Sequence, residues 1–256
     1  MADRLVGCLI KFDRALTHLE ILKESIKGFK EAQTNRYPGK FDPDSGQYVF
    51  RVEARPIPKI EWGGLIGDVL HNLRASLDYL AWELVDCHSP GQGNGRTEFP
   101  IFLSPEKFKQ SAPAKTKGMS PEACAVIERL QPFKESPAER HPSENLLWVL
   151  QSLVTVDKHR TLTLTAEAIG LHWEGLPPGV HAADPNFLQE EYTTATVTLN
   201  PGPNPERWVN VEFVASSDVC FAPRGPAGGE FVIPTLWDIA YHICERVVPQ
   251  LRRFVT

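Results

Sequence analysis

Apolar side chains recur at steps of three and four residues along the beginning of the chain, with charged residues between them. On a helix this spacing produces a single apolar stripe. We therefore expect one long amphipathic helix from Leu5 to about Phe29. The stripe could be a coiled-coil seam between two chains, although covering the core of its own chain is the simpler interpretation. Its members are Leu5, Leu9, Phe12, Leu16, Leu19, Leu22, Ile26 and Phe29.

The next segment has the pattern of a β-hairpin at about residues 40–56. The stretch Pro43-Asp44-Ser45-Gly46 is rich in turn-forming residues. Apolar and polar residues then alternate from Tyr48 to Arg55, which is typical of a strand with one buried face. The second strand carries the stronger signal, and we expect Pro56 and Pro58 to end it.

A second long helix is predicted by GDVLHNLRASLDYLAWELVDCH, residues 67–88, and we expect it to pair with the first as an antiparallel helix hairpin. The following residues, 89–117, are rich in Gly, Pro and Lys, and predict a long surface connection. Within it, Phe99, Ile101 and Phe102 should contact the core. The predicted buried face of the helix comprises Ile66, Leu70, Leu73, Leu77, Leu80 and Leu84.

Two shorter helices and then several strands are predicted in the rest of the chain. Ser120 with Pro121 should open one helix, and Ser143 should cap another that ends near Arg160. From Thr161 onward the pattern changes to alternation, which indicates antiparallel strands. Thr235 should begin a last helix, with Leu236, Ile239, Ile243, Val247 and Leu251 on its buried face. The predicted strands are TLTLTAEA, TATVTLN, WVNVEFVAS and EFVIP.

These elements together predict an α+β fold. Residues 1–160 should form a helical region that carries the hairpin at about 40–56, and residues 161–256 an antiparallel sheet closed by a C-terminal helix. We expect the two regions to pack as one globular unit.

Composition narrows the classes of function. The chain has 256 residues, of which 42% are hydrophobic, and a formal charge of -5, so it can bury a core but has no general basic footprint for nucleic acid. The five cysteines include no CxxC pair, which suits a reducing compartment. Charged residues interrupt the first turns, so we expect neither a signal peptide nor a membrane span, and a cytoplasmic protein.

One polar constellation stands out on the second helix. His71, Arg74 and Asp78 follow steps of three and four residues, so they share one stripe beside the apolar ridge. Asp157 lies on a later helix and is aimed at the same interior. An unpaired buried charge is costly, so we expect Arg74 to pair with Asp157 and Arg160 to pair with Asp78. These crossed pairs would form a structural network that holds two helices in register.

Familiar catalytic motifs do not appear in the sequence. There is no GxGxxG, Walker loop, HExxH or GxSxG, and we expect no cofactor and no metal ion. Only His71 and His159 are predicted to lie near other ionisable groups. We expect the other six histidines to be solvated or to cap helices; these are His18, His88, His141, His172, His181 and His242.

Several motifs resemble those of an uncharacterised bacterial protein family. The shared features are a start like RALTHLE, a hairpin like DPDSGQYVFRV, the helix GDVLHNLRASLD and the tetrapeptide DKHR. The resemblance covers most of the first 160 residues and is specific as a set of motifs. It implies common ancestry and no assigned activity.

The helix that carries Arg74 is also similar to helices of the HEPN group, many of which are metal-independent ribonucleases with an Arg, four to six intervening residues and a His. Arg74 matches the Arg, but Tyr79, Leu80 and Ala81 occupy the positions for the His. The resemblance implies a HEPN-like core. Together with the apolar stripe of the first helix, it predicts a homodimer.

Two hypotheses of function follow. The first is an intracellular binding or regulatory protein of unknown ligand, in which the four-residue network is structural. The alternative is an endoribonuclease in which Arg74 stabilises the charged phosphorane, His71 or His159 moves the proton, and RNA is the substrate.

Overall fold

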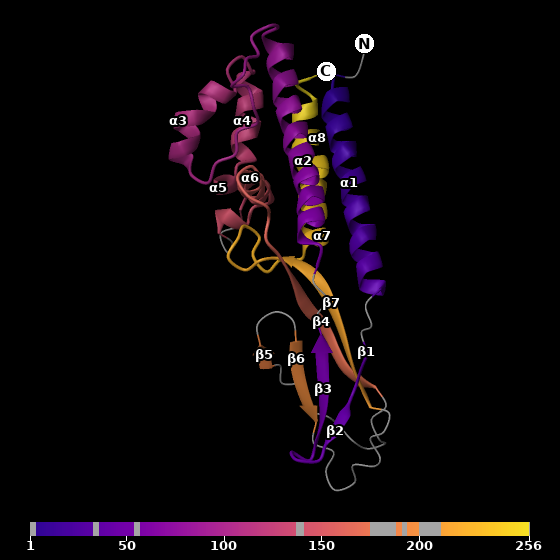
Figure 1. Ribbon diagram of the computed structural model, residues 1–256. Helices are drawn as coiled ribbons and strands as arrows, with labels where there is room; N and C mark the ends of the chain where they lie inside the picture. Colours follow the sequence, from indigo (N-terminus) through magenta and orange to yellow (C-terminus); the bar gives the residue numbers. More distant parts are fainter. Residues whose placement is uncertain are drawn as a thin grey trace. The chain divides into compact units, whose positions relative to one another are not determined.

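The computed structural model describes residues 4–32, 36–53, 57–136, 141–174, 188–190, 194–199 and 211–255, and it has a largely helical α+β fold (Figure 1). Two compact units each combine separate stretches of the chain. The helical unit contains Met1–Glu24, Lys59–Leu164 and Cys220–Thr256, and the strand unit contains Ser25–Pro58 and Thr165–Val219. The boundary that the sequence placed at residue 160 lies near one of the four points where the chain passes between units.

The antiparallel pairing of the first two long helices is confirmed. Helix α1 spans Val6–Glu31 and helix α2 spans Lys59–His88. Arg4, just before α1, is 3.0 Å from Asp86 near the end of α2, whereas His18 is 3.9 Å from Asp68 nearer its start. The six residues predicted for the buried face of α2 are all at most 1% exposed.

The buried seam of α1 differs in part from the predicted stripe. Leu9 is 41% exposed, whereas Cys8 and Ala15 are buried in its place. Small residues let the two helices approach closely: a Cβ atom added at Gly7 would lie 2.6 Å from the Tyr79 ring. The predicted stripe was chosen by hydrophobicity alone. It therefore included the large side chain of Leu9 and left out the smaller Cys8 and Ala15, which are the buried ones. The buried members are Leu5, Cys8, Ala15, Leu19, Leu22 and Ile26.

The connection after α2 contains a helix that the sequence analysis missed. Helix α3 spans Pro105–Lys115, and the Ser104 side chain caps its first turn. Its polar composition and the internal Pro113 concealed it. Phe99 and Ile101 are buried as predicted, and Phe102 is half-buried.

The following helices complete the middle of the helical unit. Helix α4 spans Pro121–Arg129 and is capped by Ser120, as predicted. Helix α5, Pro132–Glu135, and a short 3-10 helix η1, Pro142–Glu144, lead to helix α6, Leu146–Asp157. The cap of α6 is Asn145, so the prediction of Ser143 was wrong; Pro142 starts a separate turn before it.

The C-terminal helices belong to the helical unit. Helix α7 spans Val232–His242, continues through a π-helical segment η3, Ile243–Val247, and ends in α8, Val248–Arg252. Helix α7 packs on α6 and α2, and α8 packs on α4. The predicted buried residues are confirmed, with Thr235 9% exposed. The predicted EFVIP strand is wrong: Phe231 makes one isolated bridge with Cys220, and the helix begins at the next residue.

The strand unit contains the predicted hairpin and the later strands. Strand β2, Lys40–Asp42, pairs antiparallel with β3, Gln47–Glu53, and β3 also pairs antiparallel with β6, Thr194–Leu199. Early and late parts of the sequence thus share one sheet, of order β2-β3-β6-β5, in which β5 is Leu188–Glu190. Residues 54–56, including Pro56, and 208–210 of WVNVEFVAS lie outside the described residues.

A second sheet of three strands has the order β1-β7-β4. Strand β1 spans Arg36–Pro38, β4 spans Leu164–Glu174 and β7 spans Glu212–Phe221. Arg36 bridges neighbouring carboxylates, 2.6 Å from Glu174 and 3.0 Å from Glu212. Within the described ranges, no helix is long and apolar enough to cross a membrane.

Candidate functional site

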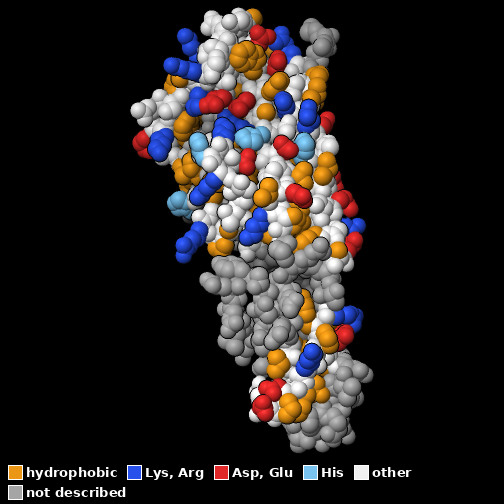
Figure 2. All heavy atoms as spheres, viewed as in Figure 1, with side chains coloured by type: hydrophobic (Ala, Val, Ile, Leu, Met, Phe, Trp, Pro, Cys, Tyr) orange, Lys and Arg blue, Asp and Glu red, His pale blue; other side chains and the backbone are white. Residues whose placement is uncertain are grey.

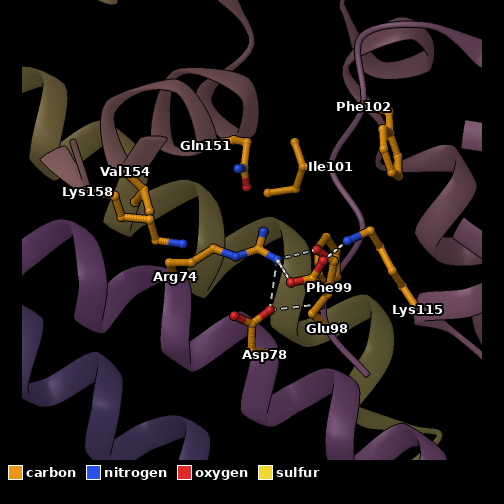
Figure 3. A pocket seen from close by; sticks show the side chains of 10 residues that line it. All are labelled: Arg74, Asp78, Glu98, Phe99, Ile101, Phe102, Lys115, Gln151, Val154 and Lys158. Atoms are coloured by element: carbon orange, nitrogen blue, oxygen red, sulfur yellow. Dashed lines mark hydrogen bonds and ion pairs between the residues drawn. The ribbon is translucent and has the colours of Figure 1, made fainter. Parts of the chain in front are cut away.

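A pocket of about 180 Å³ opens beside Arg74 within the helical unit (Figure 3). We call it the Arg74 pocket. Arg74 and Asp78 come from α2, Lys115 from α3, and Gln151, Val154 and the capping residue Lys158 from α6 and its end. The remaining wall is the irregular segment 98–102, which contributes Glu98, Phe99, Ile101 and Phe102.

Arg74 and Asp78 fasten that irregular segment to α2. The Nη2 atom of Arg74 donates to Asp78 Oδ1 at 2.9 Å and to the Phe99 carbonyl oxygen at 2.6 Å. The same Asp78 oxygen accepts the backbone N–H of Phe99 at 2.9 Å. Both backbone polar groups of a residue outside regular structure are therefore paired, as buried backbone requires.

Gln131 fastens the next part of the same wall. Its side chain is fully buried; Oε1 accepts the N–H of Phe102 at 3.0 Å, and Nε2 donates to the Pro100 carbonyl oxygen at 2.8 Å. Arg74, Asp78 and Gln131 therefore fix the course of segment 99–102. Because this backbone is fixed, the pocket has a preformed apolar side, which is lined by Phe99, Ile101 and Phe102.

A second ion pair lies at the same pocket. Lys115 pairs with Glu98, whose other carboxylate oxygen is 3.9 Å from Arg74 Nη2. Burial and the nearby Arg74 charge lower the pKa of Lys115, while Asp78 acts in the opposite direction. Burial also lowers the pKa of Arg74, against which Asp78 acts. A guanidinium nevertheless stays charged at physiological pH.

One nitrogen of the Arg74 guanidinium has no hydrogen-bond partner among the described residues. This Nη1 atom is buried, and the whole side chain is 11% exposed. In Figure 3, Nη1 points into the pocket, and the Lys158 side chain extends toward Arg74 from the other wall. A buried donor without an acceptor is costly, and more so on a charged group. Such an atom is suited to receive an acceptor from a ligand.

The predicted crossed pairs do not form. Arg74 binds Asp78 on its own helix, whereas Asp157 Oδ2 lies 3.0 Å from His71 Nε2. Gly67 explains the position of Asp157, because an added Cβ there would be only 2.7 Å from its Oδ2 atom. The missing side chain lets the end of α6 approach α2 one turn before His71. The Arg160 side chain is exposed and does not reach Asp78.

The structure separates the predicted catalytic histidines from the Arg74 pocket. His71 is 44% exposed, His159 is exposed, and neither lines the pocket. The three residues that the ribonuclease hypothesis requires are therefore not together, because Arg74 lines the pocket and both histidines lie outside it.

Other histidines meet their expectations in part. His141 caps η1, as predicted. His242 was expected to be solvated or to cap a helix, but its side chain is 12% exposed, makes no cap hydrogen bond and lies 3.4 Å from Glu135 Oε2. Burial raises the pKa of Glu135, but His242, Arg246 and a hydrogen bond from Asn145 together outweigh it and hold that pKa below its usual value. The structure does not describe the side chain of residue 172, and residue 181 lies outside the described residues.

Sequence reasoning found two of the residues that line the pocket, Arg74 and Asp78. It missed Glu98 and Lys115, because both fall in the segment interpreted as a surface connection. Gln151 lies in α6 and Lys158 caps its end. A helix was predicted here, but no spacing in the sequence links these two residues to Arg74. Only the packing of α6 on α2 brings them together.

A larger pocket of about 790 Å³ lies between the start of α6 and the loop before α7. Its carboxylates, Glu144, Glu230 and Asp238, are exposed. Water can therefore solvate them, whereas it has little access to Arg74 Nη1. The Arg74 pocket is thus the better candidate site.

Comparison with protein-family models, with curated proteins and with solved structures found no match for this chain. Within the described parts of the chain, no three His, Cys, Asp or Glu side chains are grouped so that they could hold a metal ion. None of the five cysteines forms a disulfide bond.

Proposed function

We propose that the protein is a binding or regulatory protein that takes a small anion into the Arg74 pocket. The observation that carries the proposal is the buried Nη1 atom of Arg74, which faces the pocket and has no acceptor among the described residues. An anionic oxygen placed there would gain a charge-assisted hydrogen bond. The structural and binding roles of Arg74 are compatible, because they use different nitrogen atoms.

The charge of the pocket supports an anionic ligand. Arg74, Lys115 and Lys158 contribute three positive charges, and Asp78 and Glu98 contribute two negative ones. The protein as a whole is acidic, so this local excess of positive charge is not a general surface property. On the face of the helical unit shown in Figure 2, basic and acidic side chains are intermixed, which suits a small ligand better than an extended nucleic-acid backbone.

Two substitutions test the use of Nη1 and of Lys158. Arg74→Lys keeps a positive charge and can still donate to Asp78 and Phe99, but it has no second nitrogen for a ligand. Lys158→Met removes an exposed charge at the pocket. Arg160→Met removes an exposed charge two residues further on, outside the pocket, and serves as the matched control.

Isothermal titration calorimetry with acetate, pentanoate, inorganic phosphate and butyl phosphate measures the effect. We expect the parent to bind at least one of these anions. Lys158→Met should lose about fivefold in affinity, the scale of one partly exposed ion pair, and Arg74→Lys should lose more. Arg160→Met should stay within about twofold of the parent. No binding of any anion, or equal losses in Lys158→Met and Arg160→Met, would overturn the proposal.

A further inference from the structure

We infer that the Arg74 pocket selects a monocarboxylate with a short apolar body and discriminates against phosphates, with Glu98 as the residue that sets this choice. The inference rests on the proposed function, since it names the ligand class of the same site. Three features of the pocket carry it: the number of free donors, the position of its own carboxylates, and its apolar side.

The free donors suit one carboxylate. Arg74 Nη2 is already occupied by Asp78 and the Phe99 carbonyl oxygen, so the guanidinium cannot offer the two-nitrogen fork that favours phosphate. Nη1 can bind one ligand oxygen. Lys158 lines the same pocket and extends toward Arg74 in Figure 3, so we assign the second ligand oxygen to its amine. A carboxylate has two oxygens and one charge, which these two donors match.

The resident carboxylates penalise a second negative charge. Asp78 is 2.9 Å and Glu98 is 3.9 Å from Arg74 Nη2, so both lie beside the place where the ligand would bind. The five charged side chains leave an excess of one positive charge, which a carboxylate neutralises. A phosphate monoester carries about -1.5 to -2 charges at neutral pH and would face repulsion from both acids.

Glu98 contributes more to this discrimination than its distance alone suggests. It also pairs with Lys115, and in doing so it neutralises the third cation of the pocket. Replacing Glu98 by Gln would remove one negative charge and release the Lys115 amine for the ligand. Asp78 cannot be tested in the same way, because it holds the Phe99 backbone.

The apolar side of the pocket accounts for the body of the ligand. Phe99, Ile101, Phe102 and Val154 line it. Arg74 and Gln131 fix the course of segment 99–102 through hydrogen bonds to the backbone of Phe99, Pro100 and Phe102. Burying one methylene group against such a wall should raise the affinity about fourfold. The pocket of about 180 Å³ limits that body to a short chain.

Calorimetry at pH 8, where a phosphate monoester is a dianion, compares probes with matched bodies. We expect pentanoate to bind at least about tenfold more tightly than butyl phosphate and than acetate, since one charge repulsion or two to three buried methylenes amount to that factor. Pentanamide, which has the same body without charge, should not bind measurably. In Glu98→Gln the preference for pentanoate over butyl phosphate should fall by at least about threefold. Glu122→Gln, an exposed acid outside the pocket, should leave it unchanged.

The outcomes separate this inference from the proposed function. If no anion binds, the proposed function fails. If butyl phosphate binds as tightly as pentanoate, the site is an anion site but its assignment to monocarboxylates is wrong. If acetate binds as tightly as pentanoate, the apolar side makes no contribution. An unchanged preference in Glu98→Gln removes Glu98 as the determinant.

Discussion

At the residue scale, Arg74 shows how one side chain can hold a fold and leave part of itself open. Its Nη2 atom binds Asp78 and the Phe99 carbonyl oxygen, and its Nη1 atom faces the pocket without a partner among the described residues. The pairing is local, within α2, because Asp78 lies one turn further along the same helix face. Asp157, the partner predicted for Arg74 from another helix, lies 3.0 Å from His71 instead.

A double-mutant cycle tests this pairing. Arg74→Met and Asp157→Leu should be additive within about 0.5 kcal/mol in the free energy of unfolding, because the structure gives them different partners. Arg74→Met with Asp78→Leu should instead show a coupling of about 1 kcal/mol or more. Denaturant melts of the singles and doubles measure both values. Strong coupling between Arg74 and Asp157 would restore the predicted crossed pair.

The Glu135–His242 contact predicts a pH dependence. Because the pKa of Glu135 is lowered in the folded state, its stabilising contribution is present above the usual carboxyl pKa of 4.5 and is lost as the pH falls through the lower folded value. Glu135→Gln should therefore be less stable than the parent at pH 7, and the difference should shrink below about pH 4.5. Denaturant melts across pH measure it, with the exposed Glu144→Gln as the control. A difference that does not change with pH would contradict the assignment.

At the element scale, the approach of α6 to α2 depends on one glycine. A Cβ added at Gly67 would lie 2.7 Å from Asp157 Oδ2, whereas a Cβ at Gly64, three residues earlier in α2, meets nothing within 4 Å. The two positions lie in the same helix and differ only in what they face. Substitutions at Gly64 and Gly67 therefore distinguish the effect of helix propensity on stability from the effect of packing against α6.

We expect Gly64→Ala to stabilise the protein by up to about 1 kcal/mol, the usual gain from replacing glycine inside a helix. Gly67→Ala should be destabilising despite the same propensity gain, by about 1 to 3 kcal/mol from overpacking. Thermal and denaturant melts of the two variants give the comparison. Equal stabilisation by both would mean that α6 does not contact α2 at this point.

At the scale of the whole molecule, association remains a prediction. The stripe of α1 that suggested a homodimer is largely buried within the chain, but Val6, Leu9 and Ile10 remain 41–54% exposed on its outer side. We expect any dimer contact to use this outer face. Light scattering at micromolar concentration should give the mass of a dimer, and Ile10→Lys should reduce it to that of a monomer. Ile60→Lys, at another exposed apolar position, is the control. A monomeric parent would refute the prediction.

The ribonuclease alternative is tested on the intact protein. We expect mixed RNA to stay intact in the presence of EDTA, because neither His71 nor His159 lines the Arg74 pocket. Gel electrophoresis of the RNA after incubation is sufficient. Cleavage that persists in EDTA and disappears in both Arg74→Lys and His71→Ala would reinstate the alternative.

Much of the fold could be predicted because it depends on local patterns. The long helices, the cap at Ser120, the hairpin turn and the buried face of the last helix all follow from spacing and from residues that fix backbone geometry near themselves. The same reasoning identified Arg74 and Asp78 as a polar stripe beside the core. These features are determined by the sequence because neighbours along the chain create them.

The tertiary structure decided what depends on distant residues. It joined β3 to β6 in one sheet, turned the expected EFVIP strand into the start of α7, and brought Lys158 and Glu98 to the pocket of Arg74. It also placed Asp157 beside His71, because Gly67 has no side chain that would collide with the Asp157 carboxylate. Such pairings depend on which helices and strands pack together, so local periodicity could name the charged residues but could not assign their partners.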